Sequence, residues 1–208
     1  MASPVVTKLL DNPDNIEIIR EQVAGILHLE TRNQLLLAQK GEAANIDDYD
    51  IKIYLEHELP FSLKEKDDVK NFPCVNVSLD STAMQSGSTK NADKTMKATF
   101  FIDCYNHGNF SGDGLTGRSA NVAAWKTARI VRNIICASDY TFLKLRGIVG
   151  GREITRMQTG KPPGESSAAN LSIVRITLEV TYNEQSPEVT GVPLEIVAIA
   201  VSADGMIC

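Results

Sequence analysis

The sequence has little of the chemistry that metal and thiol sites need. Its 208 residues include only three histidines and four cysteines, Cys74, Cys104, Cys136 and Cys208. No two cysteines are close enough for a CxxC pair, the usual mark of a metal or redox site. We therefore expect buried free thiols, as in a reducing cytosol, instead of a disulfide framework. We expect no metal and no cofactor.

The chain also lacks long hydrophobic runs and an excess of positive charge. No stretch approaches the about 20 apolar residues of a membrane helix, and no basic leader opens the chain as in a secretion signal. The formal net charge of −5 argues against broad binding of DNA or anionic membranes, because phosphate affinity comes from clustered Lys and Arg. Such a charge still suits a protein that lets DNA pass without holding it.

What the sequence does contain is alternation of apolar and polar residues. The clearest example is segment 171–182, and segments 49–56, 75–80 and 95–105 show the same pattern. Period-two alternation is typical of antiparallel strands with one dry face and one face in water. The wet face would suit a polar subunit interface, a water-filled lumen or an ordinary exposed sheet. Its side chains would be those of Lys52, Glu56, Lys97, Thr99, Asp103, Arg175, Thr177 and Glu179.

Two segments have the apolar spacing of helices. The first begins between Asp11 and Asp14, has Glu17 in its first turn and would stop at Gly41. The second, 118–137, carries an alanine stripe that would let its backbone approach a sheet closely. Together these segments predict an α+β fold, a mainly antiparallel sheet with one face covered by two helices. Long polar loops are expected at 81–93, 107–117 and 159–169.

One domain is expected at this length, over residues 1–187 with an irregular arm at 1–13. Segment 139–158 fits either a short helix or a strand. Residues 188–208 would form a C-terminal strand or arm. Within this arm, 194–201 is apolar on both faces and must be covered. Its own fold would cover it, or it would pair with the sheet edge of a neighbouring subunit.

Three groups of residues resemble catalytic or metal motifs. Gly112–Gly117 spells GxGxxG, but the strand before it alternates and lies six residues away, unlike the tight turn of a dinucleotide site. We interpret it as a loop leading into a helix. Cys104 would point inward and Asp103 outward, so with His107 they form no nucleophilic site. The acidic residues near 47–50 and 56–58 lack the ligand spacing of calcium or zinc sites.

No residue is expected to be catalytic, so the candidates are contact residues. Arg118, Lys126, Arg129 and Arg132 gather opposite the alanine stripe of the second helix. They would form either an ordinary solvent face or a docking surface for an acidic neighbour or for phosphate. Further candidates lie in the polar loops and the C-terminal arm, namely Gln85, Lys90, Lys94, Lys161, Leu194 and Ile196.

Taken in order, these elements resemble a known family. After the leading helix come Tyr49–Phe61 (YDIKIYLEHELPF), Pro73–Asp80 (PCVNVSLD) and Thr99–Gly108 (TFFIDCYNHG). The alanine-rich helix follows, and Ile173–Pro187 (IVRITLEVTYNEQSP) closes the core. Over about residues 14–187 the chain resembles the tail terminator, or tail completion, proteins of long-tailed bacteriophages. The likeness rests on element order and residue pattern, with no invariant catalytic motif.

The resemblance implies a non-enzymatic structural protein of the virion tail and neck, assembled in the cytoplasm of the host bacterium. It would form a hexameric ring that caps the tail tube, stops tube polymerisation and joins the tail to the head-side connector. Its partners would be further copies of itself, the tail tube protein, the connector or neck protein and, in a contractile tail, the sheath. DNA would pass through the lumen without specific binding, and no membrane would be involved.

Two alternatives stay open. The first is a head–tail connector or neck component of another ring type. The second belongs to a different class, a small nucleotide-binding enzyme that uses the Gly112–Gly117 loop.

Overall fold

The computed structural model describes residues 13–42, 45–57, 72–86, 94–108, 116–160 and 171–184. In this part of the chain the helices and strands are α1 (Asn15–Leu37), β1 (Lys52–Leu55), β2 (Cys74–Ser86), β3 (Lys94–His107), α2 (Thr116–Cys136), β4 (Val149–Gly160) and β5 (Leu171–Glu184). Short turns lie at Ala38–Glu42 (η1), Asp47–Tyr49 (η2) and Ser138–Tyr140 (η4).

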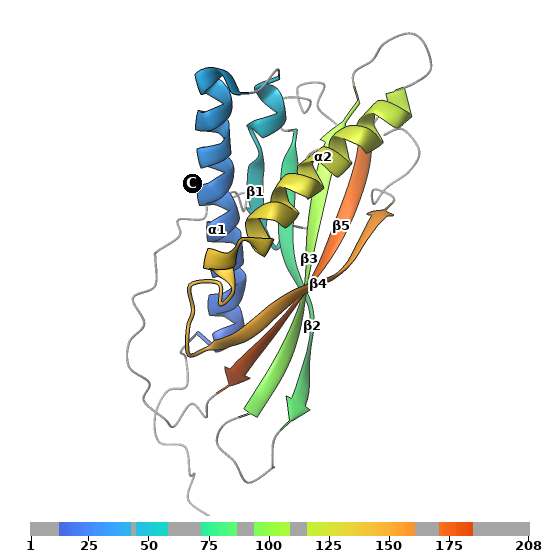
Figure 1. Ribbon diagram of the computed structural model, residues 1–208. Helices are drawn as coiled ribbons and strands as arrows, with labels where there is room; N and C mark the ends of the chain where they lie inside the picture. Colours follow the sequence, from blue (N-terminus) through green and yellow to red (C-terminus); the bar gives the residue numbers. More distant parts are fainter. Residues whose placement is uncertain are drawn as a thin grey trace, which may run out of the picture.

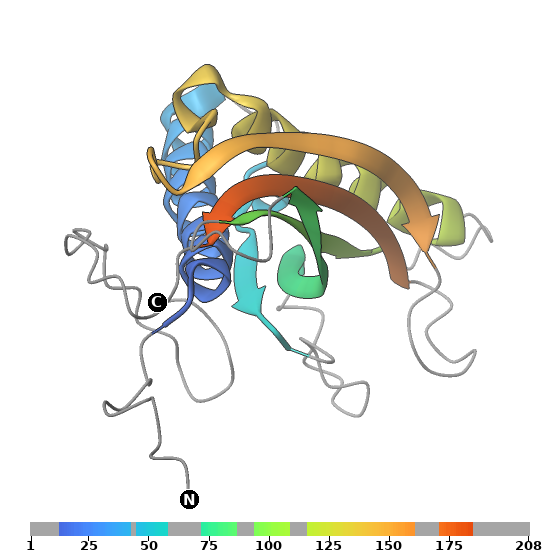
Figure 2. The same cartoon turned by 90° about the horizontal axis from the view of Figure 1, so that it is seen from below.

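The strands form one five-stranded sheet in the order β1–β2–β3–β5–β4. All neighbouring strands run antiparallel except β1, which runs parallel to β2. Both helices lie on the same side of the sheet, and the strands curve so that the side without helices is concave (Figure 1, Figure 2). The predicted fold, α+β with a mostly antiparallel sheet and two helices packed against it, is confirmed.

The ends of α1 follow from residues at its two termini. The carboxylate of Asp14 accepts a hydrogen bond of 3.0 Å from the backbone N–H of Glu17, which satisfies one of the free donors at a helix start. After the helix, Gly41 has a φ of 97°, a left-handed conformation that suits glycine. Between these ends the helix buries an apolar stripe against the sheet. Its members are Ile16, Ile19, Val23, Ile26 and Leu27.

The second helix lies close to the sheet because its inner side carries small side chains. Ala120, Ala124 and Ala128 are buried in the interface with β3 and β5. Methyl side chains let the helix backbone approach the strands, and larger side chains from the sheet fill the remaining space. The largest of the fully buried side chains is Phe100 of β3. The predicted alanine stripe therefore fixes how closely the helix and sheet layers pack.

Strand β2 is longer than predicted. It continues through residues 81–86, where a loop was expected, and stays paired with β3. The pairing register shifts at Asp80 and again at Gln85, as it does at the β-bulges that are common in edge strands. Hydrogen bonds between the two backbones maintain this part of β2, even though the side chains of residues 81–85 are exposed. The β2–β3 hairpin consequently reaches beyond the helices (Figure 1).

Two further segments are settled by the structure. Segment 139–158, which fitted a helix or a strand, begins in turn η4 and ends in strand β4. The strand expected at 171–182 is two residues longer, because β5 continues to Glu184. The arm at 1–12 and the C-terminal residues from 185, including the strand expected at 194–201, lie outside the described residues. Of the helices that are described, none has the length and apolarity needed to cross a membrane.

Replacing Ala128 with Leu tests the close approach of α2. The added side chain has no space between α2 and the sheet, so we expect the free energy of unfolding to fall by about 1–3 kcal/mol. Urea denaturation followed by circular dichroism measures this loss. The matched control is Asn133→Leu, at an exposed position of the same helix. Equal losses in the two variants would contradict the proposed role of the stripe.

Candidate functional site

One end of the concave face is apolar. Cys74, Tyr105 and Ile173 form a row across β2, β3 and β5, and they are buried together with Tyr54 of β1. The prediction of a face open to water along its whole length is therefore wrong at this end. Alternation fixes the side of the sheet on which a residue lies, but it does not determine whether that side is covered. Burial raises the pKa of Cys74 and of Tyr105, so both groups stay protonated near pH 7.

The next row across the concave face contains an ion pair. Nε and Nη2 of Arg175 donate hydrogen bonds of 2.7 Å to the two carboxylate oxygens of Asp103. The same guanidinium lies 4.2 Å from the centroid of the Phe101 ring. Asp103, predicted to be in water, is only 4% exposed. Its hydrogen bonds to Arg175 raise the pKa of that guanidinium, and the bidentate geometry ties β3 to β5.

Toward the β2–β3 hairpin the concave face is polar and exposed. Lys97 and Glu179 form an ion pair of 2.5 Å across β3 and β5. Two of the predicted contact residues lie at this end: Gln85 is exposed near the end of β2, and Lys94 is exposed at the start of β3. Met84, next to Gln85 on β2 and opposite Met96 of β3, is 56% exposed. The hairpin thus presents both polar and apolar side chains that a partner could contact.

The structure separates the four basic residues predicted to gather on α2. Lys126 forms an ion pair of 2.5 Å with Asp48 of turn η2 and lies 5.1 Å from the centroid of the Tyr49 ring. Arg129 and Arg132 are exposed, and neither has an ion-pair partner among the residues that the structure describes. The side chain of Arg118 is outside that description. Of the three whose side chains the structure describes, Arg129 and Arg132 therefore form an available positive surface.

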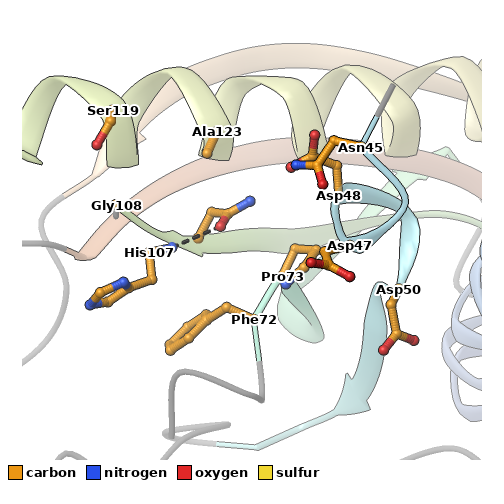
Figure 3. A pocket seen from close by; sticks show the side chains of 11 residues that line it. Asn45, Asp47, Asp48, Asp50, Phe72, Pro73, His107, Gly108, Ser119 and Ala123 are labelled. Carbon is orange, nitrogen blue, oxygen red and sulfur yellow. Dashed lines mark hydrogen bonds between the residues drawn. The ribbon is translucent and has the colours of Figure 1, made fainter. Parts of the chain in front are cut away.

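A pocket of about 440 Å³ lies between turn η2, the end of β3 and α2 (Figure 3). Its lining includes Asp47, Asp48, Asp50 and His107. The His107 ring stacks on Phe72 with 6.1 Å between the centroids, and burial lowers the pKa of the imidazole. Because this histidine is neutral near pH 7, the pocket is negative overall. Even so, no three His, Cys, Asp or Glu side chains in the described ranges are placed to hold a metal ion.

The cysteines occupy two kinds of environment. Cys104 faces the core while Asp103 faces Arg175, as alternation predicts, so thiol and carboxylate do not converge. Burial, with a smaller effect of the Asp103 charge, raises the pKa of Cys104 well above its ordinary value, and such a thiol is a poor nucleophile. Cys136 is exposed, contrary to the expectation that the cysteines are buried. Cys208 lies beyond the described part of the chain.

The environment of the GxGxxG motif is also visible in part. Most of Gly112–Gly117 lies outside the described residues, but the preceding strand, β3, is paired with antiparallel neighbours on both sides. A dinucleotide-binding loop instead follows a strand of a parallel sheet. The chain does cross over from β3 through α2 to β4, but β5 lies between β3 and β4 in the sheet.

Some predicted contact residues lie outside the described part of the chain, and some exposed residues were not predicted. Lys90, Lys161, Leu194 and Ile196 fall outside the described ranges. Three exposed apolar residues, Ile46, Val122 and Trp125, were not singled out from the sequence. For the last two a signal existed, because they share helical spacing with the exposed arginines of α2.

Comparisons with known proteins give no family. No protein-family model matches the chain, and no curated protein matches it. Conclusions about function therefore depend on the geometry above and on the family resemblance of the sequence.

Replacing Arg175 with Met tests the ion pair on the concave face. The substitution leaves the Asp103 carboxylate buried without its partner. We expect the free energy of unfolding to fall by about 2 kcal/mol, less than for a fully buried pair because Arg175 is itself part-exposed. Chemical denaturation measures the loss. The control is Lys97→Met, which breaks the more exposed pair with Glu179 and should cost less than about 1 kcal/mol; a larger loss in the control would contradict the assignment.

Replacing His107 with Gln tests the burial of the imidazole beside the pocket. The pKa of His107 is lower in the folded chain than its ordinary value of 6.5, so below that pH the unfolded chain binds more protons. Stability should therefore fall as the pH falls from about 6.5 toward the folded pKa, and His107→Gln should reduce this slope. Denaturation midpoints at a series of pH values measure it. Parallel curves for both proteins would show that His107 is not protected from protonation.

Proposed function

We propose that the chain is a tail terminator of a long-tailed bacteriophage. It would form a ring on the end of the tail tube, stop further tube growth and provide the surface that meets the head-side connector. The observation that carries the proposal is the one-sided sheet. A helix, three strands, a second helix and the closing strand β5 follow in the order of the family resemblance, with β4 inserted before β5. The two helices leave the concave face uncovered by helix.

The electrostatics of the concave face support this role. Four of its charges occur as pairs across neighbouring strands, Asp103 with Arg175 and Lys97 with Glu179. Glu153 and Arg156 of β4 add one exposed charge of each sign. Paired charges make a face hydrophilic without a strong field of either sign, because each charge is largely compensated by its partner. Such a face would neither hold nor repel a passing DNA strand strongly, since phosphate binding requires uncompensated Lys and Arg. The face is therefore suited to a lumen.

The edges of the domain support assembly. The β2–β3 hairpin extends past the helices (Figure 1), and residues 81–85 of β2 are exposed on it. On the opposite side of the sheet, α2 presents exposed Val122, Trp125 and two arginines. A subunit in a ring needs two different contact surfaces, one for each neighbour, and a further surface for the tube or connector. The described part of the chain offers several such surfaces.

Electron microscopy of the negatively stained protein, alone and with tail tubes of its own phage, tests the proposal. We expect rings with sixfold symmetry at one end of each tube, because the role requires a closed cap of matching symmetry. Rings of twelvefold symmetry would favour the connector alternative. A chain that stays monomeric with the tubes and leaves their length uncontrolled would refute the terminator role.

Nucleotide titration distinguishes the enzyme alternative. The terminator role predicts no saturable binding of ATP or NAD by the full chain, as measured by isothermal titration calorimetry. Gly114→Ala serves as the matched variant, because an added methyl group would obstruct a phosphate-binding loop. Binding that this substitution abolishes would favour the enzyme and contradict the proposal.

A further inference from the structure

The outer surface of α2 next to β4 has the composition of a protein contact. Val122, Trp125, Arg129 and Arg132 are spaced by three and four residues, which places them on one stripe of the helix. Val122 is 63% exposed and Trp125 38%. Met157 of β4 lines the same shallow hollow. Apolar side chains flanked by arginines are typical of contact surfaces, where Trp and Arg contribute most of the binding energy.

The side chains of this α2–β4 surface are available for a partner. The indole N–H of Trp125 donates a hydrogen bond of 3.2 Å to Oγ1 of Thr159, which fixes the ring beside β4 while leaving part of its face exposed. The guanidinium groups of Arg129 and Arg132 have no carboxylate partner within the described ranges. Lys126, by contrast, is held by Asp48. The surface therefore combines a fixed aromatic anchor with two positive charges that have no counter-charge in the described part of the chain.

A complementary surface lies on the other flank of the same helix. There, Ser119 and Ala123 of α2 line the pocket beside η2 (Figure 3). Ile46, just before the turn, is 44% exposed, and Asp47, the first residue of the turn, and Asp50, just after it, are also exposed. This η2 surface thus combines one apolar side chain with nearby negative charges, whereas the α2–β4 surface combines apolar side chains with positive charges.

Within one copy the charges of the two surfaces are not paired with each other. The ion pair between Asp48 and Lys126 holds turn η2 on one flank of α2, whereas Trp125 is bonded to Thr159 of β4 on the other flank. Val122 lies between them, in a hollow that Lys126 also lines. No ion pair joins Asp47 or Asp50 to Arg129 or Arg132 in the described part of the chain, so these charges are available to a second copy. Because the two surfaces differ, the contact is head-to-tail, and repeated contacts of this kind close into a ring when the rotation between copies allows it.

We propose that the η2 surface of one copy docks on the α2–β4 surface of the next copy. Ile46 would cover Val122 and Trp125, while Asp47 and Asp50 would face Arg129 and Arg132. That such contacts close into a ring rests on the proposed function. The contact itself needs only two copies of the chain. The charges also favour this head-to-tail contact over a contact between two identical surfaces, because two identical surfaces would place like charges together.

Disulfide cross-linking between two variants tests the contact. In a chain with Cys136→Ser and Cys208→Ser, one variant carries Ile46→Cys and a second, distinguished by a size tag, carries Val122→Cys. A disulfide forms only when the two Cβ atoms approach to about 4 Å, so we expect a mixed dimer after mild oxidation. The control replaces Val122→Cys by Leu29→Cys, at an exposed position on α1. Cross-linking no faster than in this control would overturn the proposal.

Charge reversal tests the specificity of the same cross-link. Arg129→Glu with Arg132→Glu in the Val122→Cys chain should slow the cross-link by about tenfold or more. Asp47→Arg with Asp50→Arg in the Ile46→Cys chain should then restore the rate. Circular dichroism checks that each variant is folded. The proposed pairing would be overturned if the arginine substitutions left the cross-linking rate unchanged. It would also be overturned if the aspartate substitutions did not restore the rate.

The outcomes also distinguish this contact from the terminator role. A specific cross-link in a chain that does not cap tail tubes would refute the role and support the contact. Rings on tubes without the cross-link would refute the contact alone.

Discussion

The two helices pack against only one face of the sheet, and the rest of the structure depends on this one-sided packing. The alanines of α2 let it lie close enough to bury the apolar side chains of β3 and β5 beneath it. No helix of the described residues covers the concave face, so its polar groups must be satisfied by partners on neighbouring strands or by water. The pairs Asp103–Arg175 and Lys97–Glu179 meet this need for four of its charged groups. Glu153 and Arg156 of β4 add one exposed charge of each sign.

The elements that local patterns describe were predicted well. A helix start between Asp11 and Asp14, the stop at Gly41 and the alanine stripe each depend on residues a few positions apart, and each is confirmed. The direction of β1 was not foreseen, because parallel pairing with β2 leaves no trace in alternation. Residues 81–86 were taken for a loop because both of their faces are exposed, and a strand of that kind has no alternation to recognise.

In the candidate site, too, the sequence predicted what depends on neighbouring residues and missed what depends on residues far apart in the chain. The spacing on α2 groups Lys126 with Arg129 and Arg132, but the partner of Lys126 is Asp48, 78 positions away. Burial of Asp103 likewise depends on Arg175, 72 positions away. Spacing alone cannot distinguish a cation that is already paired from one that is available to a partner. The structure makes that distinction, and it reduces the positive surface to two arginines next to Trp125.

The same ion pair that removes Lys126 from this surface has a second effect on assembly. By holding η2 against one flank of α2, Asp48 keeps its neighbours Asp47 and Asp50 beside the pocket on that flank. Within the described residues, neither carboxylate forms an ion pair with Arg129 or Arg132. Opposite charges are thus present in one chain without pairing there, and association with a further copy would pair them. On this proposal, the intramolecular ion pair of Lys126 is what leaves the other charges for the contact between copies.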